Sequence, residues 1–205
     1  MKLIDLTLPW KPCTQVRRIP LTLPEGEFAA LVYEFSYDSM TGTYVDFPGH
    51  IAETDDGVDA ENFSPAGLYR VPAAVIRLNR QDGSGAVMTE ELQSAADGRD
   101  LRVPAIIINA LGNKRFDEIA ERSVYLHADA AEWLISHGIK LLVSDIYESN
   151  KEPQSVFLRL FRAGVLTVCL PVNLHMLPEN VRLTVMFPRV KNVTQLPCRI
   201  VAETE

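Results

Sequence analysis

The chain has 205 residues, and its 20 Lys and Arg residues against 27 Asp and Glu residues give a formal net charge of −7. Nucleic acids are bound by clustered basic side chains, and the basic residues here are scattered, so we expect no nucleic-acid partner. Apolar residues make up 47% of the chain and charged residues 23%, which is typical of a globular domain and excludes a disordered chain.

Short apolar runs rich in β-branched residues alternate with a few helical stretches, which predicts a mixed α/β fold. No linker is long or polar enough to separate two domains, so residues 1–205 are expected to form a single domain. In chain order, strands are predicted at Lys2–Leu6, Ala29–Ser36, Ala73–Leu78, Ala105–Ala110, Leu141–Ser144, Val165–Cys169, Val181–Pro188 and Cys198–Ala202.

Three helical stretches interrupt these strands. The clearest is Ala128–Ser136, which has its cap at Leu126 or His127 and a stop signal at His137-Gly138. A second covers Val156–Arg162. A short third stretch, Thr89–Ala96, lies within Gln81–Gly98, which we interpret as a surface excursion.

The hydropathy of the sequence predicts neither a membrane helix nor a signal peptide. The longest nearly apolar stretches, Val103–Leu111 and Gly164–Val172, are far shorter than the roughly 20 residues that cross a bilayer, so we expect no membrane helix. Residues 1–6 lack the apolar core of a signal peptide, so we expect the mature chain to start here, in the cytoplasm. The three cysteines have no CxxC spacing and are expected to be reduced.

The most unusual segment is Asp38–His50, which combines two glycines, a proline, a carboxylate and an imidazole after a predicted strand. Glycine permits backbone geometries that side chains forbid, and such a loop can present side chains rigidly. Asp46 and His50 are four residues apart, close enough for the carboxylate to orient the imidazole and raise its basicity. Alternatively, His50 is a satisfied structural histidine.

This segment resembles the signature His-x-Gly-Thr-His-x-Asp-x-Pro-x-His of the cyclase and kynurenine formamidase family, with Gly42, Thr43, Asp46, Pro48 and His50 in register. The resemblance implies a single α/β domain of the swivelling β/β/α type, assembled into dimers or tetramers. It also implies hydrolysis of a small amide or lactam at a divalent metal. Further stretches similar to the family are 4–7, 71–76, 130–134, 138–141, 173–174 and 177–178.

The metal ligands of that family are replaced here. Met40 and Tyr44 stand where the motif has two histidines, and the later His and Glu ligands fall on Phe157 and Cys169, which leaves Asp46 alone. A divalent ion needs several imidazole or carboxylate donors, and these side chains do not supply them. We therefore expect no catalytic metal and no other cofactor.

The resemblance also assigns candidate catalytic roles to three residues. His50 occupies the position that acts in proton transfer in the family. Tyr44 could donate its phenol to a carbonyl or enolate oxygen, and Asp46 could orient His50 or act as a base itself. The alternative is that Tyr44 and Met40 simply fill the vacated metal cavity.

The expected substrate contacts surround this segment. Trp10 lies in a loop that in the family walls the substrate pocket, including that of a neighbouring subunit, or it packs in the core. Asp145, Glu148 and Ser149 follow a buried strand and either contact ligand or form a turn and a helix start. The substrate-binding residues that we expect are Trp10, Met40, Thr43, Phe47 and Glu148.

Two functions remain open. The first is a metal-independent cyclase, lyase or hydrolase of specialised metabolism that acts on a small carbonyl-containing metabolite by cyclisation, dehydration, isomerisation or opening of an activated lactone. The second is an inactive paralogue that binds a small molecule or stabilises an oligomer. In both cases we expect a homo-oligomer, a dimer or tetramer, without a nucleic-acid or membrane partner.

Overall fold

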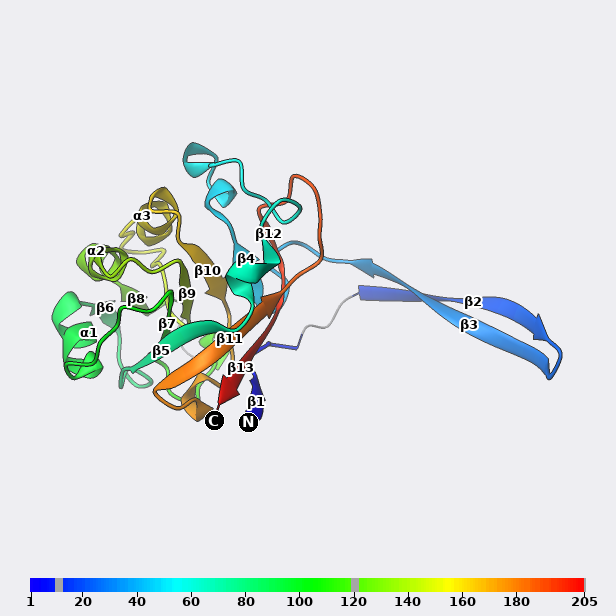
Figure 1. Ribbon diagram of the computed structural model, residues 1–205, viewed down its shortest axis with the longest axis horizontal. Helices are drawn as coiled ribbons and strands as arrows, with labels where there is room; N and C mark the ends of the chain where they lie inside the picture. The colour runs from blue at the N-terminus through cyan, green and yellow to red at the C-terminus, as the bar shows by residue number, and fades with distance from the viewer. Residues whose placement is uncertain (10–12, 119–121, 205) are drawn as a thin grey trace.

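One mixed β-sheet organises the computed structural model, which describes residues 1–9, 13–118 and 122–204. The strand order across the sheet is β1–β13–β11–β5–β7–β9–β10–β4–β12 (Figure 1). The bounds are β1 Lys2–Asp5, β4 Tyr44–Asp46, β5 Val71–Arg77, β7 Ala105–Asn109, β9 Leu141–Ser144, β10 Leu166–Cys169, β11 Asn180–Met186, β12 Gln195–Pro197 and β13 Arg199–Thr204.

The centre of the sheet is parallel. Strands β5, β7, β9 and β10 are parallel neighbours, and the chain passes between them through helices α1 (Thr89–Ala96), α2 (Ala128–Ser136) and α3 (Val156–Arg162). All three helices begin and end at the predicted residues. All five residues of β7 are buried, which is expected of a strand covered on both faces.

The two faces of the sheet bury different clusters, because successive side chains of a strand point to opposite sides. Ile108 and Leu142 face the helices and pack with Leu134 of α2 and Leu160 of α3. Residues at the alternate positions of these strands, such as Ile107, face the interior of the curled sheet. Strands β12 and β13 are consecutive in the sequence but lie near opposite ends of the strand order, and the curl of the sheet brings these ends together. Cys198 links the two strands, and its N–H donates to the Thr43 carbonyl at 2.9 Å.

These features confirm the predicted mixed α/β single-domain fold, but some short strands were not predicted. Strands β4 and β12, and the parallel pair β6 (Gly85–Val87) and β8 (Val124–Leu126), have three residues each, too few to show an alternating pattern. Val87 and Leu92 are fully buried. The interpretation of Gln81–Gly98 as a surface excursion is therefore wrong, because α1 packs on the sheet.

Strands β2 (Cys13–Leu23) and β3 (Gly26–Ser36) form a hairpin that projects far from the rest of the molecule (Figure 1). The predicted strand Ala29–Ser36 is part of β3. Its partner β2 was not predicted, because Pro20 interrupts the run and proline is tolerated only where its missing N–H is not needed. Pro20 lies opposite Ala29 in an isolated two-stranded ribbon, which has only edge strands.

Short 3-10 segments connect the remaining strands, and η1 carries His50 directly after β4. Among the described residues, no helix has the length and apolar character needed to cross a bilayer. The 3-10 segments are η1 Pro48–His50, η2 Ala52–Thr54, η3 Pro65–Leu68, η4 Phe116–Glu118 and η5 Leu174–Met176.

Candidate active site

A cavity of about 410 Å³ opens at the carboxyl ends of β9 and β10. Open α/β sheets bind ligands in such crevices, because the loops that leave neighbouring parallel strands diverge there. The cavity lies beside β4, which runs antiparallel to β10 and begins at this edge. Its lining residues are Met40, Tyr44, Phe116, Asp117, Arg122, Val124, Ser144, Asp145, Ile146, Tyr147, Glu148, Phe157, Cys169 and Leu170.

Tyr44 brings a phenol to the cavity wall from the first position of β4. It lies opposite Cys169 in the β4–β10 pair, so the two side chains are neighbours at the cavity wall. Burial raises the pKa of Tyr44, and the nearby Cys169 and Asp46 raise it further. The phenol therefore remains neutral at physiological pH and can act as a hydrogen-bond donor but not as a base.

Asp46 lies behind this wall, in a row of polar side chains that crosses three strands. It is 1% exposed and lies opposite Thr167 of β10 and Gln195 of β12. Its Oδ2 accepts hydrogen bonds from Thr167 Oγ1 at 3.0 Å and from Cys169 Sγ at 3.5 Å. Its Oδ1 has no partner in hydrogen-bond geometry, although the Gln195 side chain favours the charged form. Burial outweighs these contacts and raises the pKa of Asp46.

His50 contacts this row of polar side chains from the solvent-exposed side, through Gln195. Its imidazole is exposed and is not among the residues that line the cavity. Ser39 donates to Gln195 Oε1, so the Gln195 amide nitrogen is the donor to His50 Nε2, which lies 3.1 Å away. The three predicted catalytic residues therefore lie close together. Cys169 is opposite Tyr44 and donates to Asp46, and Gln195 is opposite Asp46 and donates to His50.

Asp145 is one of three carboxylates on the cavity wall, with Asp117 and Glu148, and it directly follows β9. Its Oδ1 accepts from the Ala110 N–H at 2.9 Å, and its Oδ2 accepts from the Leu111 N–H at 3.0 Å and from Asn109 Nδ2 at 2.9 Å. Burial raises the pKa of Asp145 to about 6 even though these donors favour the charged form. Just above that pH, Asp145 is a carboxylate with the basicity suited to proton transfer near neutrality.

The raised pKa of Asp145 predicts a pH-dependent contribution to stability. Because folding raises this pKa from 3.8 to about 6, the folded protein binds more protons between these values. The contribution is therefore fully present below pH 3.8 and falls by about 3 kcal/mol as the pH rises through 6. Urea unfolding should show that the stability difference between wild type and Asp145→Asn shrinks from about pH 4 to about pH 7. A pH-independent difference would contradict this assignment.

Arg122 adds a cation to the cavity wall. Its guanidinium donates to Asn150 Oδ1 at 2.9 Å and is exposed, and its positive charge partly offsets the pKa increase of Tyr44. The sequence pattern did not reveal this residue, because Arg122 lies in a loop without a motif and meets Tyr44 only in the folded chain. Both Arg122 and the wall residue Leu170 have left-handed backbone angles, with φ of 50° and 56°. Such conformations are uncommon for these residue types and gather at ligand sites.

The expected substrate-binding residues divide into two groups. Met40 and Glu148 line the cavity, and Glu148 is held there because Oε2 accepts the Val156 N–H at 2.7 Å, at the start of α3. Phe47 is fully buried, with its ring edge-on to the rings of Phe63 and Phe187. The structure therefore places Phe47 in the core and not on the cavity wall, because β4 alternates between the two faces of the sheet.

The structure also places Thr43 away from the cavity wall, in contrast to the expected substrate contact. It is 1% exposed, accepts the Leu8 N–H at 2.7 Å and donates to the Leu170 carbonyl at 2.8 Å. Both functions of its hydroxyl are thus used within the protein, so it ties the N-terminal segment to the end of β10. Trp10 lies outside the described residues.

The donor set around Asp46 does not fit a divalent metal. Its neighbours are a thiol, a neutral phenol and a hydroxyl, and burial raises the pKa of the Cys169 thiol, so the thiolate that binds metal is disfavoured. Within 1–9, 13–118 and 122–204, no three His, Cys, Asp or Glu side chains are grouped as metal ligands. Cys169 and Cys198 are free and buried.

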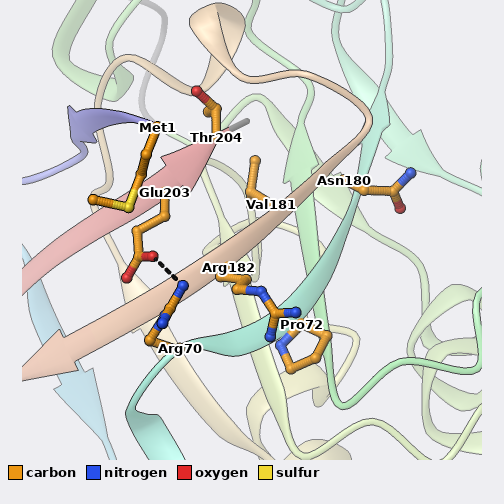
Figure 2. Close-up of a pocket in the computed structure, with 8 residues that line it drawn as sticks. All are labelled: Met1, Arg70, Pro72, Asn180, Val181, Arg182, Glu203 and Thr204. Carbon is orange, nitrogen blue, oxygen red and sulfur yellow. Dashed lines mark ion pairs between the residues drawn. The ribbon is translucent and has the colours of Figure 1, made fainter.

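A second hollow of about 430 Å³ lies over β5, β11 and β13, away from these groups. Figure 2 shows Arg70 and Glu203 facing each other in this hollow, and their guanidinium and carboxylate form an ion pair at 2.9 Å. The lining residues include no histidine or cysteine that could perform acid/base or nucleophilic chemistry. The cavity beside Tyr44 is therefore the better candidate site.

Comparison with known proteins agrees with the family resemblance seen in the sequence. The sequence pattern of a family described as "Putative cyclase" matches residues 4–150. No curated protein matches the chain. The fold is shared with solved structures of low sequence identity, which agrees with the expected swivelling β/β/α type.

Three of these structures illustrate the likeness. Isatin hydrolase A from Labrenzia aggregata is 18% identical, with a TM-score of 0.76 over 98% of this chain and 93% of that one. Isatin hydrolase A from Ralstonia solanacearum is 18% identical, with a TM-score of 0.76 over 98% and 91%. A predicted metal-dependent hydrolase from Bacillus stearothermophilus is 18% identical, with a TM-score of 0.70 over 98% and 97%.

Proposed function

Because this chain belongs to the cyclase family, we propose that it is an enzyme that performs acid/base chemistry on a small carbonyl compound without a metal ion. One observation carries the proposal. A single cavity is lined by a neutral phenol, Tyr44, a carboxylate with a pKa of about 6, Asp145, and a cation, Arg122. These groups supply a hydrogen-bond donor, a base and an anion-binding group, which is what proton transfer next to a carbonyl requires.

In the proposed reaction, the Asp145 carboxylate accepts a proton from the carbon next to the substrate carbonyl. The electron pair of the broken C–H bond forms the enolate, whose oxygen receives a hydrogen bond from the Tyr44 hydroxyl. A carbonyl oxygen is a stronger acceptor than the nearby Cys169 sulfur, so the phenol can turn its proton to the substrate. The protonated Asp145 then returns the proton to the same carbon, which gives exchange with solvent, or to another carbon, which completes an isomerisation. In a dehydration it protonates the departing hydroxyl, which leaves as water, and in a ring closure it protonates the carbonyl oxygen that the enolate carbon attacks.

Asp46 and His50 act behind the cavity wall in this proposal. Burial raises the pKa of Asp46, so a negative charge behind the phenol is disfavoured relative to an exposed carboxylate. Its contact with Cys169 orients the sulfur that lies opposite Tyr44. His50, linked through Gln195, is a positioning residue.

The substrate class follows from the cavity wall. Phe157 stacks on Tyr147 with ring centroids 5.0 Å apart, and apolar side chains such as Met40 and Phe116 complete this side. Arg122 favours an anionic group at the mouth. The proposed substrate is therefore a small aromatic carbonyl compound with a carboxylate, for which phenylpyruvate is a suitable probe.

The test of this proposal measures exchange of deuterium from D₂O into the carbon next to the phenylpyruvate carbonyl, followed by proton NMR. The protein treated with a chelator should accelerate exchange above the buffer rate, and added Mn²⁺ or Zn²⁺ should leave this acceleration unchanged. Elemental mass spectrometry should find substoichiometric metal in the purified protein. Activity that depends on added metal would contradict metal independence.

Isatin provides the second probe, because isatin hydrolases are among the structurally similar proteins. Ring opening of this lactam needs a nucleophilic water, and a metal ion usually activates that water. We expect little or no isatin hydrolysis in the absence of metal. Hydrolysis of isatin only after addition of Mn²⁺ would instead indicate that the chain retains a metal-dependent activity.

The apolar cavity wall also favours a second candidate, an inactive paralogue that binds a small molecule. Met40 and Phe157 replace polar groups of the family motif and line the cavity. In this case, phenylpyruvate should bind, as measured by calorimetry, while the exchange rate stays at the buffer value. The same two measurements thus separate catalysis from binding.

A further inference from the structure

We propose that Glu148 is a positioning residue for the substrate ring, because its carboxylate holds the start of α3 and thereby places Phe157 on the cavity wall. This role rests on the proposed function, in which the cavity takes a small aromatic carbonyl compound. It differs from the direct substrate contact that the sequence predicts for Glu148. Both carboxylate oxygens of Glu148 accept hydrogen bonds from the backbone at the start of α3.

These two hydrogen bonds replace the usual cap of a helix. The first N–H groups of a helix have no partner within it, and the N-cap side chain commonly accepts one of them. The N-cap residue of α3, Ser155, makes no such hydrogen bond. Instead, Glu148 Oε1 accepts the Gln154 N–H and Oε2 accepts the Val156 N–H at 2.7 Å. Glu148 therefore supplies the acceptors that Ser155 does not.

The backbone at Ser155 needs such an anchor. Its φ of 57° lies in the left-handed region. This conformation is uncommon for residues other than glycine and persists where the surrounding structure holds it. Glu148 binds the residues on both sides of Ser155. Loss of its carboxylate should therefore loosen the turn that leads into α3.

This turn determines where the ring of Phe157 lies. Phe157 is the second residue of α3 and stacks on Tyr147 at the cavity wall, with ring centroids 5.0 Å apart and planes 21° apart. Tyr147 is fixed independently, because its hydroxyl donates to the Leu142 and Val168 carbonyls. The stack is thus fixed by Tyr147 on one side and by the start of α3 on the other.

An ordered aromatic wall favours an aromatic substrate over an aliphatic one. A favourable aromatic pair tightens binding by roughly 2–10-fold beyond the buried area, and a ring that is already in place loses less freedom when the ligand binds. The Glu148 carboxylate itself would repel the carboxylate of the proposed substrate. Both effects favour an indirect role of Glu148, through Phe157, over a direct contact.

The test uses Glu148→Gln and two keto acids, phenylpyruvate and pyruvate. The amide of glutamine does not accept both N–H groups, because its nitrogen is a donor. The two probes share a carbonyl and a carboxylate but differ in the ring. The KM for phenylpyruvate exchange should rise roughly 3–10-fold and that for pyruvate less than about twofold. Equal increases for the two probes would indicate a direct contact and overturn the proposal.

Glu132→Gln is the matched control. Glu132 also contacts α3, through an ion pair with Arg159 at 2.5 Å, but on the exposed side of the helix. Neither KM should change by more than about twofold in this variant. In a Phe157→Leu background, Glu148→Gln should no longer change the ratio of the two KM values, because the ring that it positions is absent.

Amide hydrogen exchange followed by NMR tests the anchor without turnover. The Val156 amide should exchange at least about tenfold faster in Glu148→Gln than in wild type or Glu132→Gln. Unchanged exchange would overturn the proposal. If circular dichroism shows that Glu148→Gln is unfolded, Ser155→Gly is added to both wild type and variant, because glycine adopts a positive φ without strain. The same comparison is then made between these two proteins.

The two keto acids also separate this proposal from the proposed function. If wild type does not catalyse exchange, dissociation constants from calorimetry replace the KM values, and the same change in their ratio is expected. The proposed reaction would then be refuted while the positioning role stands. Conversely, wild type that catalyses exchange but binds phenylpyruvate no more tightly than pyruvate would refute the positioning role alone.

Discussion

Replacing Asp145 by asparagine is expected to lower the kcat of phenylpyruvate exchange by roughly 10²–10⁴-fold, the usual effect of losing a general base. The asparagine amide has a similar shape but does not accept a proton at neutral pH. Wild-type kcat/KM should fall on the acid side with an apparent pKa of about 6, the value to which burial raises the Asp145 carboxyl in the free protein. This acid limb should disappear in the variant, and NMR exchange rates measured across the pH range provide the test.

Two further variants separate the base from its surroundings. Asn109→Ala removes a hydrogen-bond donor to Asp145 Oδ2 but keeps the carboxylate. Fewer donors favour the charged form less, so the acid limb should move to higher pH while activity persists. His50→Ala should cost less than about 10-fold, because its imidazole is off the cavity wall. A loss of 10²–10⁴-fold at His50, together with full activity of Asp145→Asn, would assign proton transfer to His50.

Replacing Tyr44 by phenylalanine is expected to cost about 2–4 kcal/mol of transition-state stabilisation, mainly in kcat. The substitution removes only the hydroxyl that would donate to the enolate oxygen, and the ring that forms part of the cavity wall remains. Because the substrate carbonyl carries less charge than the enolate, KM should change little. Rates and KM from the same exchange assay test this expectation.

Tyr147→Phe is the matched control for that measurement. Tyr147 lines the same cavity, but its hydroxyl is buried and donates to the Leu142 and Val168 carbonyls at 2.9 Å each. Its loss leaves two buried acceptors without this donor and should lower the free energy of unfolding by about 1–3 kcal/mol. Activity should stay within a few-fold of wild type. Equal kinetic losses in the two variants would contradict a specific role for the Tyr44 hydroxyl.

The proposed chemistry is consistent with the replacement of the family's metal ligands. A metal polarises a carbonyl by its charge, whereas a neutral phenol polarises it by a hydrogen bond in a water-poor site. The family resemblance aligns Tyr44 and Cys169 with two metal ligands, and the structure places these two residues opposite each other in the β4–β10 pair. A phenol and a thiol whose pKa burial raises are suited to hydrogen bonding and not to metal binding.

The sequence by itself determined much of the fold. The three helices were predicted with their observed bounds, and the parallel strands were predicted because their apolar runs are long and continuous. Stop signals such as Gly138 and Gly164 depend on local backbone geometry, which neighbouring residues encode directly. The departures from the family motif at Met40 and Tyr44 were also readable, because they depend on residue types at fixed spacings in one motif, whereas metal independence itself stays a prediction.

Only the tertiary structure decided which of these residues meet. Strand register places Asp46 opposite Thr167 and Gln195, and the nearer of these in sequence, Thr167, is 121 residues away. The strands that carry Asp46 and Gln195, β4 and β12, have three residues each and are too short to predict. For Asp145 the sequence left a ligand contact and a turn residue open, because it does not reveal that burial raises the pKa of this carboxyl. Arg122 and Tyr44 share a cavity wall although 78 residues separate them in the sequence (122 − 44). Such contacts depend on long-range packing, which no local pattern records.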